Sequence, residues 1–519
     1  MQKHTAAAKF NKNIGISKSL QDLNSRNFTH WQDHSSIIFI PLTANSSLKP
    51  HKMTRFYKVF FPLCLLLAMG CNNHKQAKYI FYFIGDGFGL SQAILAEDYL
   101  DAKANDTISN HLTMLQLPVA GLSTTHSANQ FITCSAAAGT ALATGTKTNN
   151  GMLGVRPDTS ALESIAKKLH KQGYKVGIVT SVSLDHATPA AFYANAKNRR
   201  DYVEISRQLA NSGFEYFGGG ALRGEQKDSS VVQDITAAGY TMLNNRASID
   251  THTMAQGKLV ASSSITLREG ELPYVIDAPH HDMHLSYFVK KGIELLSSSN
   301  EPFFMMVEGG KIDWSCHGND AATTLHEVLE MDKAVALALD FYRAHPDETL
   351  IIITADHETG GLGIGCRGYR IYPEVLEAQQ CSEEVFSQQI DELAQRNASK
   401  QEVYQAIERS FGFNNGMAQL ALNARDTARI DMLYKLRFSS QNRDASDQLM
   451  AYDMHEKETL SSLCVKIMTE KARLGWTTLS HTGVAVPVRA IGAGADAFNG
   501  YYDNTDIPRK IMAATGKSW

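Results

Sequence analysis

The chain has 519 residues, of which 43% are hydrophobic and 20% are charged, and its formal net charge is -3. This length allows a large hydrophobic core but does not fix the number of domains, because α/β enzymes often use it for one sheet with insertions. The absence of a basic surplus argues against a nucleic acid partner, since nothing would neutralise a phosphate backbone. Any recognition of phosphate must therefore be local.

Two kinds of sequence precede the body of the chain. Residues 1–52 are polar and mixed, and we expect them to be disordered or to be upstream sequence that does not belong to the protein. From Met53 two basic residues precede an apolar run over 59–69, which is typical of a signal peptide over residues 53–71. The run is about half of the ~20 residues that span a bilayer, so a transmembrane helix is less favoured. A buried N-terminal helix is also less favoured, because Pro62 would interrupt it.

The end of this segment resembles a bacterial lipobox. Its sequence is Leu67-Ala68-Met69-Gly70-Cys71, in which the cysteine would become the lipidated first residue. We therefore expect an exported protein, periplasmic or on the cell surface, that a lipid anchor at Cys71 holds to the membrane. Residues 72–519 would then form a single domain.

The remaining cysteines do not indicate a disulfide framework. Five of the seven lie in the body: Cys134, Cys316, Cys366, Cys381 and Cys464. An odd number argues against complete pairing. Cys366 and Cys381 could close a short loop, which one sequence does not establish.

Five apolar runs in the body are expected to form buried strands, at residues 79–84, 176–179, 303–307, 350–353 and 486–491. Runs of this kind with helical patterns between them are typical of a largely parallel sheet that is covered on both faces. One helix is expected over residues 160–173, with Thr159 or Ser160 as its N-cap and Gly173 as its end, and another over about 320–345. The expected fold class is α/β, as a three-layer α/β/α sandwich.

The composition changes between Gly365 and Gly475 to Glu, Gln, Ser, Ala and Arg with helical spacing, as at residues 384–396 and 400–410. Because this block interrupts the strand pattern, we expect a mostly helical insertion at about 366–475. Its apolar positions need a surface to cover. That surface would be the rim of the ligand site or the second subunit of a homodimer.

Acidic residues and histidines follow four of the expected strands: Asp86, Asp185, His186, Glu308, Asp356, His357 and Glu358. In an open α/β sheet the ligand crevice lies beyond the carboxyl ends of the strands, so these side chains should converge. Clustered carboxylates resist burial unless cations neutralise them, which predicts a metal cluster. Taken singly, each acid could equally be an ordinary loop residue or a helix cap.

Three further residues could complete a zinc site. Asp313 and His317 stand four residues apart, which places both on one face of a helical turn as two ligands of one ion. His481 precedes the last expected strand and could be the third ligand. Alone, the D-x-x-x-H spacing is a weak signal, and a lone histidine before a strand is more often a capping or surface residue.

A candidate nucleophile, Ser135, begins a run of small residues in the segment 133–141. Small residues allow a helix to begin against the sheet, with the hydroxyl at its N-terminus, where the amides and the helix dipole favour an anion. A packing helix with an N-cap serine is the alternative, and Cys134 is a rival nucleophile. We favour Ser135, because a thiolate so near zinc would tend to become a permanent ligand.

Six segments resemble, in the same order, the successive motifs of alkaline phosphatases, and together they span residues 79 to about 495. They are Phe83-Ile84-Gly85-Asp86-Gly87, the Ser135 run with Thr144-Gly145-Thr146-Lys147-Thr148, Ala187-Thr188-Pro189-Ala190-Ala191, Val307-Glu308-Gly309-Gly310-Lys311-Ile312-Asp313, Thr354-Ala355-Asp356-His357-Glu358-Thr359-Gly360-Gly361 and His481-Thr482-Gly483. One motif would be weak evidence, whereas six in order are strong evidence.

The resemblance implies the hydrolysis of phosphate monoesters to alcohol and inorganic phosphate, through a phosphoserine at Ser135, with two Zn²⁺ and one Mg²⁺ as cofactors. The implied metal ligands are Asp313, His317 and His481 for one zinc, Asp86, Asp356 and His357 for the other, and Asp86, Thr188 and Glu308 for magnesium, with His186 in the same region. Arg199 falls where the family has its phosphate-binding arginine, and Arg200 is the neighbour to exclude. Trp314 would lie near the bound phosphate.

Three positions depart from the usual pattern without removing a metal ligand of this set. Cys134 replaces an aspartate that helps to orient the arginine. His186 stands where the enterobacterial type has aspartate and the vertebrate type histidine, and Trp314 stands where others carry lysine or histidine. The alternative functions are a phosphodiesterase or sulfatase of the same superfamily, which would lack the arginine and the third metal shell, and an inactive protein that only binds metal and phosphate.

Overall fold

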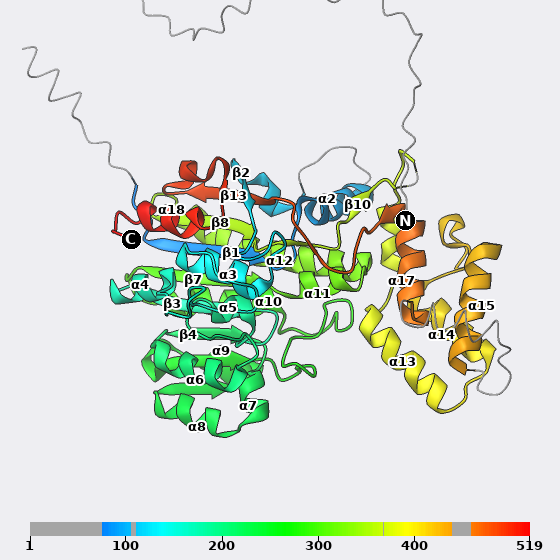
Figure 1. Cartoon of the computed structure of the whole chain (residues 1–519), viewed down its shortest axis with the longest axis horizontal. Coiled ribbons are helices and arrows are strands. Elements are labelled where there is room, and N and C mark those ends of the chain that lie inside the picture. The colour runs from blue at the N-terminus through cyan, green and yellow to red at the C-terminus, as the bar shows by residue number, and fades with distance from the viewer. Residues whose placement is uncertain (1–74, 105–110, 367, 439–457) are drawn as a thin grey trace, which may run out of the picture. The chain divides into compact units, whose positions relative to one another are not determined.

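The computed structural model describes residues 75–104, 111–366, 368–438 and 458–519 (Figure 1). The predictions for residues 1–52 and for the signal peptide at 53–71, Cys71 included, lie outside this part of the chain. Among the described helices, none combines the length and the apolar character that crossing a membrane requires.

A ten-stranded mixed sheet forms the centre of the body. Its order is β14 (Gly500–Asp503), β2 (Val119–Thr124), β13 (Val486–Gly492), β8 (Thr349–Ala355), β1 (Tyr79–Gly85), β7 (Phe303–Gly309), β3 (Lys175–Thr180), β4 (Tyr216–Gly219), β6 (Lys258–Ser262) and β5 (Tyr240–Leu243). Within this sheet only β13 runs antiparallel to its neighbours. The largely parallel sheet that the apolar runs predict is therefore present, and all five expected strands belong to it.

Helices cover both faces of the sheet, as the alternation of side chains along β1 shows. Phe81 and Phe83 belong to one hydrophobic core, and Ile80 and Tyr82 belong to the other. The first core includes residues of α2 (Leu90–Ala104), α9 (Arg246–Thr251), α10 (Leu285–Leu296), α11 (Lys311–His317) and α12 (Ala321–Ala344). The second includes residues of α3 (Ser135–Thr144), α4 (Ile165–Lys171), α5 (Ala187–Ala190), α6 (Tyr202–Ser212), α8 (Ser230–Ala237) and α18 (Asp506–Ala514). The α/β/α sandwich is thus confirmed.

The expected helix over residues 160–173 is shorter than predicted. It begins at Ile165 as α4, and its N-cap is Ser164, whose hydroxyl accepts a hydrogen bond from the amide of Lys167. The preceding residues form an isolated bridge between Val155 and Ala161 instead. Thr159 has a φ of 71°, a left-handed conformation that cannot begin an α-helix. The expected end at Gly173 is close, since α4 ends at Lys171, and the second expected helix is α12.

The block after β8 is helical, as its composition indicates. It contains α13 (Glu383–Gln395), α14 (Lys400–Phe411), α15 (Ala424–Phe438) and α17 (Leu460–Lys471), which lie together in Figure 1. Two short strands join the two ends of the insertion, since β10 (Gly363–Ile364) pairs antiparallel with β11 (Leu474–Gly475). Both ends of the insertion therefore leave the body at one place.

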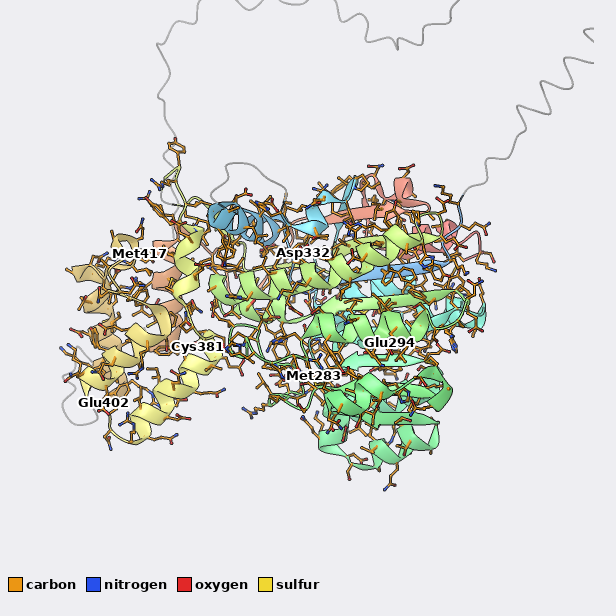
Figure 2. All side chains as sticks on the ribbon, turned by 180° about the vertical axis from the view of Figure 1, so that it is seen from behind. Met283, Glu294, Asp332, Cys381, Glu402 and Met417 are labelled. Atoms are coloured by element: carbon orange, nitrogen blue, oxygen red, sulfur yellow. The ribbon has the colours of Figure 1, made fainter. Side chains whose placement is uncertain are left out.

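The insertion is attached to the body by buried and partly buried hydrogen bonds. The carboxylate of Asp320, the N-cap of α12, accepts hydrogen bonds from the side chain of Gln379 and the amide of Glu383. The hydroxyl of Ser382 donates to Asp277 at 2.6 Å. Figure 2 shows the neighbouring Cys381 between the insertion helices and the body. Cys381 and Cys366 are both free, so the loop disulfide that their spacing allowed is not formed.

Candidate active site

The candidate site begins where the central strands end. Because β7 and β8 both pair in parallel with β1, Gly85 lies opposite Gly309 and Ala355. This register brings Asp86, Glu308 and Asp356 to the same edge of the sheet, and all three carboxylates are fully buried. The convergence expected from the strand ends is therefore observed for these three acids. Asp185 and Glu358 belong to none of the candidate metal groups, because Asp185 accepts hydrogen bonds from Ser206 and Gly224 and Glu358 accepts them from Gln92 and Thr482.

The first group of potential metal ligands is Asp313, His317 and His481. On α11, His317 Nε2 lies 3.4 Å from an oxygen of Asp313 and 3.2 Å from His481 Nε2. The Nδ1 atoms of the two histidines face the carbonyl oxygens of Leu479 and Thr133, at 2.6 and 2.8 Å. A histidine that donates from Nδ1 keeps its Nε2 lone pair free, so both rings can direct a lone pair to one cation.

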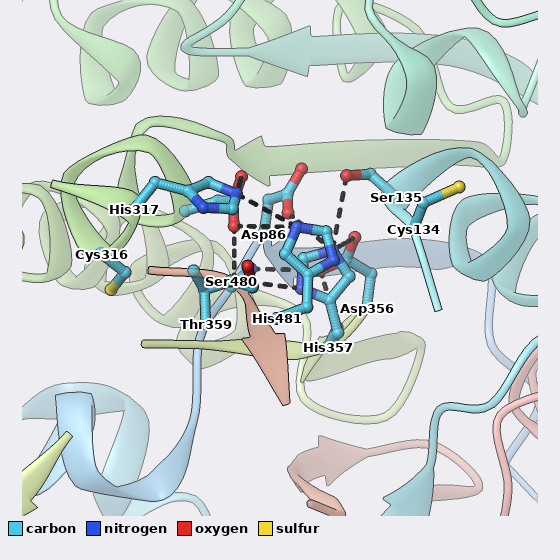
Figure 3. Close-up of polar contacts among 12 residues, drawn as sticks. Asp86, Cys134, Ser135, Cys316, His317, Asp356, His357, Thr359, Ser480 and His481 are labelled. Carbon is cyan, nitrogen blue, oxygen red and sulfur yellow. Dashed lines mark hydrogen bonds and ion pairs between the residues drawn. The ribbon is translucent and has the colours of Figure 1, made fainter. Parts of the chain in front are cut away.

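The second group is Asp86, Asp356 and His357, and all three are buried. His357 Nε2 lies 3.4 Å from Asp86 and 3.2 Å from Asp356. The same nitrogen lies 3.4 Å from the hydroxyl of Ser135. Figure 3 shows this hydroxyl directed towards the histidines, while the sulfur of Cys134 points away from them.

The third group is Asp86, His186 and Glu308. One oxygen of Glu308 accepts a hydrogen bond from Thr180, whereas the other oxygen has no partner among the described residues. The buried hydroxyl of Thr188, both oxygens of Asp86 and Nδ1 of His186 likewise form no hydrogen bond with the described residues, although one oxygen of Asp86 lies 3.4 Å from His357 Nε2. Buried polar atoms are almost always satisfied, so these atoms fit a bound cation.

Burial alone opposes ionisation of these acids. It raises the pKa of Asp86 and of Asp356 above the ordinary value, and it raises the pKa of Glu308 to about 7. Burial also lowers the pKa of His186 to about 3, which keeps this ring neutral and able to act as a ligand. A cation among the carboxylates would restore their charged form.

The donor sets also suit different ions. All three groups contain a histidine with carboxylates, and the first two, in which the histidine nitrogens lie directly beside the carboxylate oxygens, are zinc-type sets. Around Glu308, the oxygens of Asp86, Thr188 and Glu308 are the ligands that Mg²⁺ prefers. The residues present therefore fit two Zn²⁺ and one Mg²⁺.

Ser135 is the first residue of α3, and Cys134 is its N-cap. The small residues that follow allow α3 to pack closely, since a Cβ on Gly139 would lie 3.2 Å from the Cα of Thr188. The serine hydroxyl thus stands at a helix N-terminus, which favours an anion. The side chain of Cys134 has another contact, because its sulfur accepts a hydrogen bond from the amide of Gly151.

Arg199 and Trp314 also belong to this site. Arg199 Nη2 lies 3.0 Å from His186 Nε2, and the ring of Trp314 packs edge-on to His186 with 5.9 Å between centroids. Both line the same cavity as Ser135. Arg200 also lines this cavity but is exposed. All the site residues expected from the sequence are therefore gathered at one edge of the sheet.

The structure shows several contacts in this site that the sequence motifs did not predict. The hydroxyl of Thr359 donates to Asp313. The ammonium of Lys311 is fully buried, 3.5 Å from the centroid of the Tyr274 ring and 4.9 Å from that of Trp314. From the insertion, the N-cap of α13 and the first two residues of this helix, at 382–384, line the cavity.

Comparison with known proteins agrees with this geometry. The family model described as "Alkaline phosphatase" matches residues 77–218 and 211–517. Alkaline phosphatase 3 of Bacillus subtilis is 26% identical over 452 residues, which are 85% of this chain and 90% of that protein. The alkaline phosphatase of Schizosaccharomyces pombe is 28% identical over 458 residues, which are 84% of this chain and 80% of that protein. The structure of a cold-active alkaline phosphatase from a psychrophilic Shewanella sp. has a TM-score of 0.70 and 28% identity, and the match covers 84% of this chain and 99% of that one.

Proposed function

Since the chain belongs to the alkaline phosphatase family and is a phosphomonoester hydrolase, we propose that it transfers the phosphoryl group to Ser135 and then to water. The observation that supports this route is the position of the Ser135 hydroxyl. It lies at the start of α3 and 3.4 Å from His357, a member of one of the three candidate metal groups.

Arg199 would bind the phosphate before the reaction. Its guanidinium is a planar fork that can donate to two phosphoryl oxygens at once. The backbone amides at the start of α3 would bind a further oxygen. Because Arg199 and Ser135 line one cavity, the phosphorus can be held in line with the serine oxygen.

In the first step the hydroxyl of Ser135 would release its proton to solvent and its oxygen would form a bond to phosphorus while the bond from phosphorus to the ester oxygen breaks, and the alcohol leaves with a proton from solvent. In the second step water would attack the phosphoserine, which frees Ser135 and inorganic phosphate. The ions held by the three groups would supply positive charge that stabilises the attacking and leaving oxygens. Asp313, His317 and His481 would hold one ion, Asp86, Asp356 and His357 the second, and Asp86, Thr188, Glu308 and His186 the third.

The test is to measure hydrolysis of a monoester, a diester and a sulfate ester of one phenol by the purified protein, together with its metal content. We expect rapid hydrolysis of the monoester only, with about two zinc ions and one magnesium ion per chain. A diester or sulfate ester that is cleaved as fast as the monoester would contradict the proposal. So would full activity after chelation and removal of all metal.

We also propose that the chain is exported and that Cys71 carries a lipid anchor, a prediction based on the sequence of residues 53–71. The several acyl chains of a bacterial lipoprotein would hold it firmly, whereas one chain binds only weakly. Cys71→Ser should therefore release the phosphatase activity from the membrane fraction. If this variant still sediments with membranes, an uncleaved apolar helix becomes the better explanation.

A further inference from the structure

The cavity that contains Ser135 is much larger than a phosphate group. Its volume is about 990 Å³, and Arg199, Trp314 and His481 also line it. Pockets of roughly 300–1,000 Å³ commonly enclose whole small-molecule ligands. The cavity therefore has room for the alcohol part of the ester, and its wall can select among alcohols.

Four basic residues line this cavity beside the phosphate-binding arginine, and we call them the basic rim: Arg200, Arg223, Lys227 and Arg268. They come from three loops at one edge of the sheet. Arg200 follows β3, Arg223 and Lys227 lie on α7 (Arg223–Lys227) after β4, and Arg268 follows β6. Since β3, β4 and β6 are consecutive parallel strands, their loops lie side by side.

One member of the basic rim is held rigidly. Arg223 donates a hydrogen bond of 2.8 Å to the hydroxyl of Tyr202 and forms an ion pair of 2.8 Å with Glu269, and its guanidinium lies 4.2 Å from the centroid of the Tyr202 ring. The ammonium of Lys227 lies 4.6 Å from the same ring centroid. Tyr202 therefore fixes the direction of two cations, and the charge of Arg223 is balanced by Glu269.

The other three members form no ion pair with any residue that the structure describes. For Lys227, Arg200 and Arg268, no carboxylate lies within ion-pair distance among the residues that the structure describes, and all three are exposed. In a chain with a net charge of -3, such cations beside an active site are not explained by general surface charge. They are available to an anionic ligand.

Another part of the cavity wall has the opposite charge. Glu383 and Glu384 lie in the first turn of α13, and the insertion thus contributes carboxylates to the same cavity. A negative group on the substrate would be repelled there and attracted by the basic rim. Glu269 and Glu271 also line the cavity, but Glu269 is paired with Arg223 and Glu271 is buried, so the exposed cations of the basic rim still give a bound ester a preferred orientation.

We propose that the basic rim is a second anion subsite, which selects phosphate monoesters whose alcohol part carries another phosphate or a carboxylate. The inference rests on the proposed function, in which Arg199 and Ser135 bind the phosphate that is cleaved. Lys227, Arg200 and Arg268 would bind the second anionic group, while the ring of Tyr202, whose hydroxyl is bonded to Arg223, orients Lys227.

The experiment compares phenyl phosphate, 4-carboxyphenyl phosphate and 1,4-phenylene bisphosphate at constant ionic strength. The variants are Lys227→Gln, Arg268→Gln, their combination and the charge-conserving Lys227→Arg. Lys290→Gln, on an exposed position of α10 that does not line the cavity, is the matched control. Each variant is compared with the wild type on the same ester, so that differences in leaving-group reactivity cancel.

We expect the double variant to lose about tenfold more kcat/KM on the two esters with a second anion than on phenyl phosphate, mainly through KM. Lys227→Arg should retain most of this preference. A loss confined to the bisphosphate would restrict the subsite to phosphate and would still support it.

Equal losses on all three esters, or no loss on any, would overturn the subsite while leaving the proposed function intact. An effect of Lys290→Gln equal to that of the double variant would also overturn it, because the effect would then reflect overall charge. If the wild-type protein hydrolyses none of the three esters, the proposed function itself fails, and the subsite fails with it.

Discussion

Arg199 faces His186 across the candidate site, with 3.0 Å between Nη2 and Nε2. Arg199→Ala should lower kcat/KM for a monoester on the order of a hundredfold, because a two-pronged donor to the phosphate is lost. The loss for an activated diester should be smaller, since a diester offers one fewer free oxygen. Arg199→Lys, which keeps the charge but not the fork, is the control and should recover only part of the activity.

Steady-state kinetics on a matched monoester and diester would measure this difference. Equal losses on the two substrates would show that another group binds the free oxygens, and Arg200 would be the first residue to examine. The same outcome would remove the main argument for a preference for monoesters.

Individual metal ligands could be predicted from the sequence because they stand a few residues apart or directly after an apolar strand. Asp313 and His317 are four residues apart, and Asp356 and His357 follow an apolar strand directly. The contact of Lys311 with Tyr274 had no such signal, since it joins α11 to a loop 37 residues earlier and depends on how the two segments pack. Tertiary contacts of this kind leave no periodic pattern.

On α12, Glu327 is a buried acid whose titration should affect stability. Burial raises its pKa to about 7 from an ordinary value of 4.5, and one of its oxygens accepts a hydrogen bond from the amide of Val275. The protonated form is favoured in the folded protein. Its contribution to stability is fully present below pH 4.5 and is lost as the pH rises through 7.

Glu327→Gln should therefore raise the stability at pH 8 by up to about 3 kcal/mol, with little change at pH 4.5. The amide can still accept the hydrogen bond from Val275. Thermal unfolding between pH 4.5 and 8 measures the effect, with Glu330→Gln on the same helix as the control for loss of a carboxylate. A difference between Glu327→Gln and the wild type that is independent of pH would contradict the assignment.

The insertion can be tested as an element because its two ends are paired. Ile364 lies opposite Leu474 in the β10–β11 ladder, so an Asn-Gly hairpin turn can replace residues 365–473. We expect the shortened protein to keep its metals but to change its KM for bulky esters, since residues 382–384 line the cavity. If the full chain is a dimer in solution and the shortened chain is a monomer, the insertion joins the subunits of a homodimer.

Because the shortened chain could fail to fold, two point variants test the same role of the insertion. Ser382→Ala removes the N-cap of α13 and the hydrogen bond to Asp277, whereas Ser399→Ala removes only the N-cap of α14. The first should change KM more than the second, because of these two serines it is Ser382 that is hydrogen-bonded to the body. Unchanged KM for bulky esters in both the shortened chain and Ser382→Ala would show that the insertion does not shape the cavity.

Among the elements, long apolar strands were predictable and short ones were not. β1, β7 and β8 are continuous apolar runs, whereas β4 and β14 are four residues long and contain glycine. Such segments become strands only because a neighbouring strand of the sheet forms backbone hydrogen bonds with them. The predicted start of α4 was wrong for a different reason, since the bridge between Val155 and Ala161 closes a turn that includes Thr159 and Ser160, and this turn replaces the first part of the expected helix.

The whole molecule brings residues from Asp86 to His481 to one sheet edge, and the central claim is that Ser135 at this edge carries the phosphate. The direct test is to stop the reaction with acid during turnover of an aryl phosphate and to locate the phosphate by peptide mass spectrometry. The account predicts a phosphopeptide modified at Ser135 that is absent from Ser135→Ala, whose turnover should fall by several powers of ten. Phosphate on Cys134, or nearly normal turnover of Ser135→Ala with no labelled peptide, would contradict it.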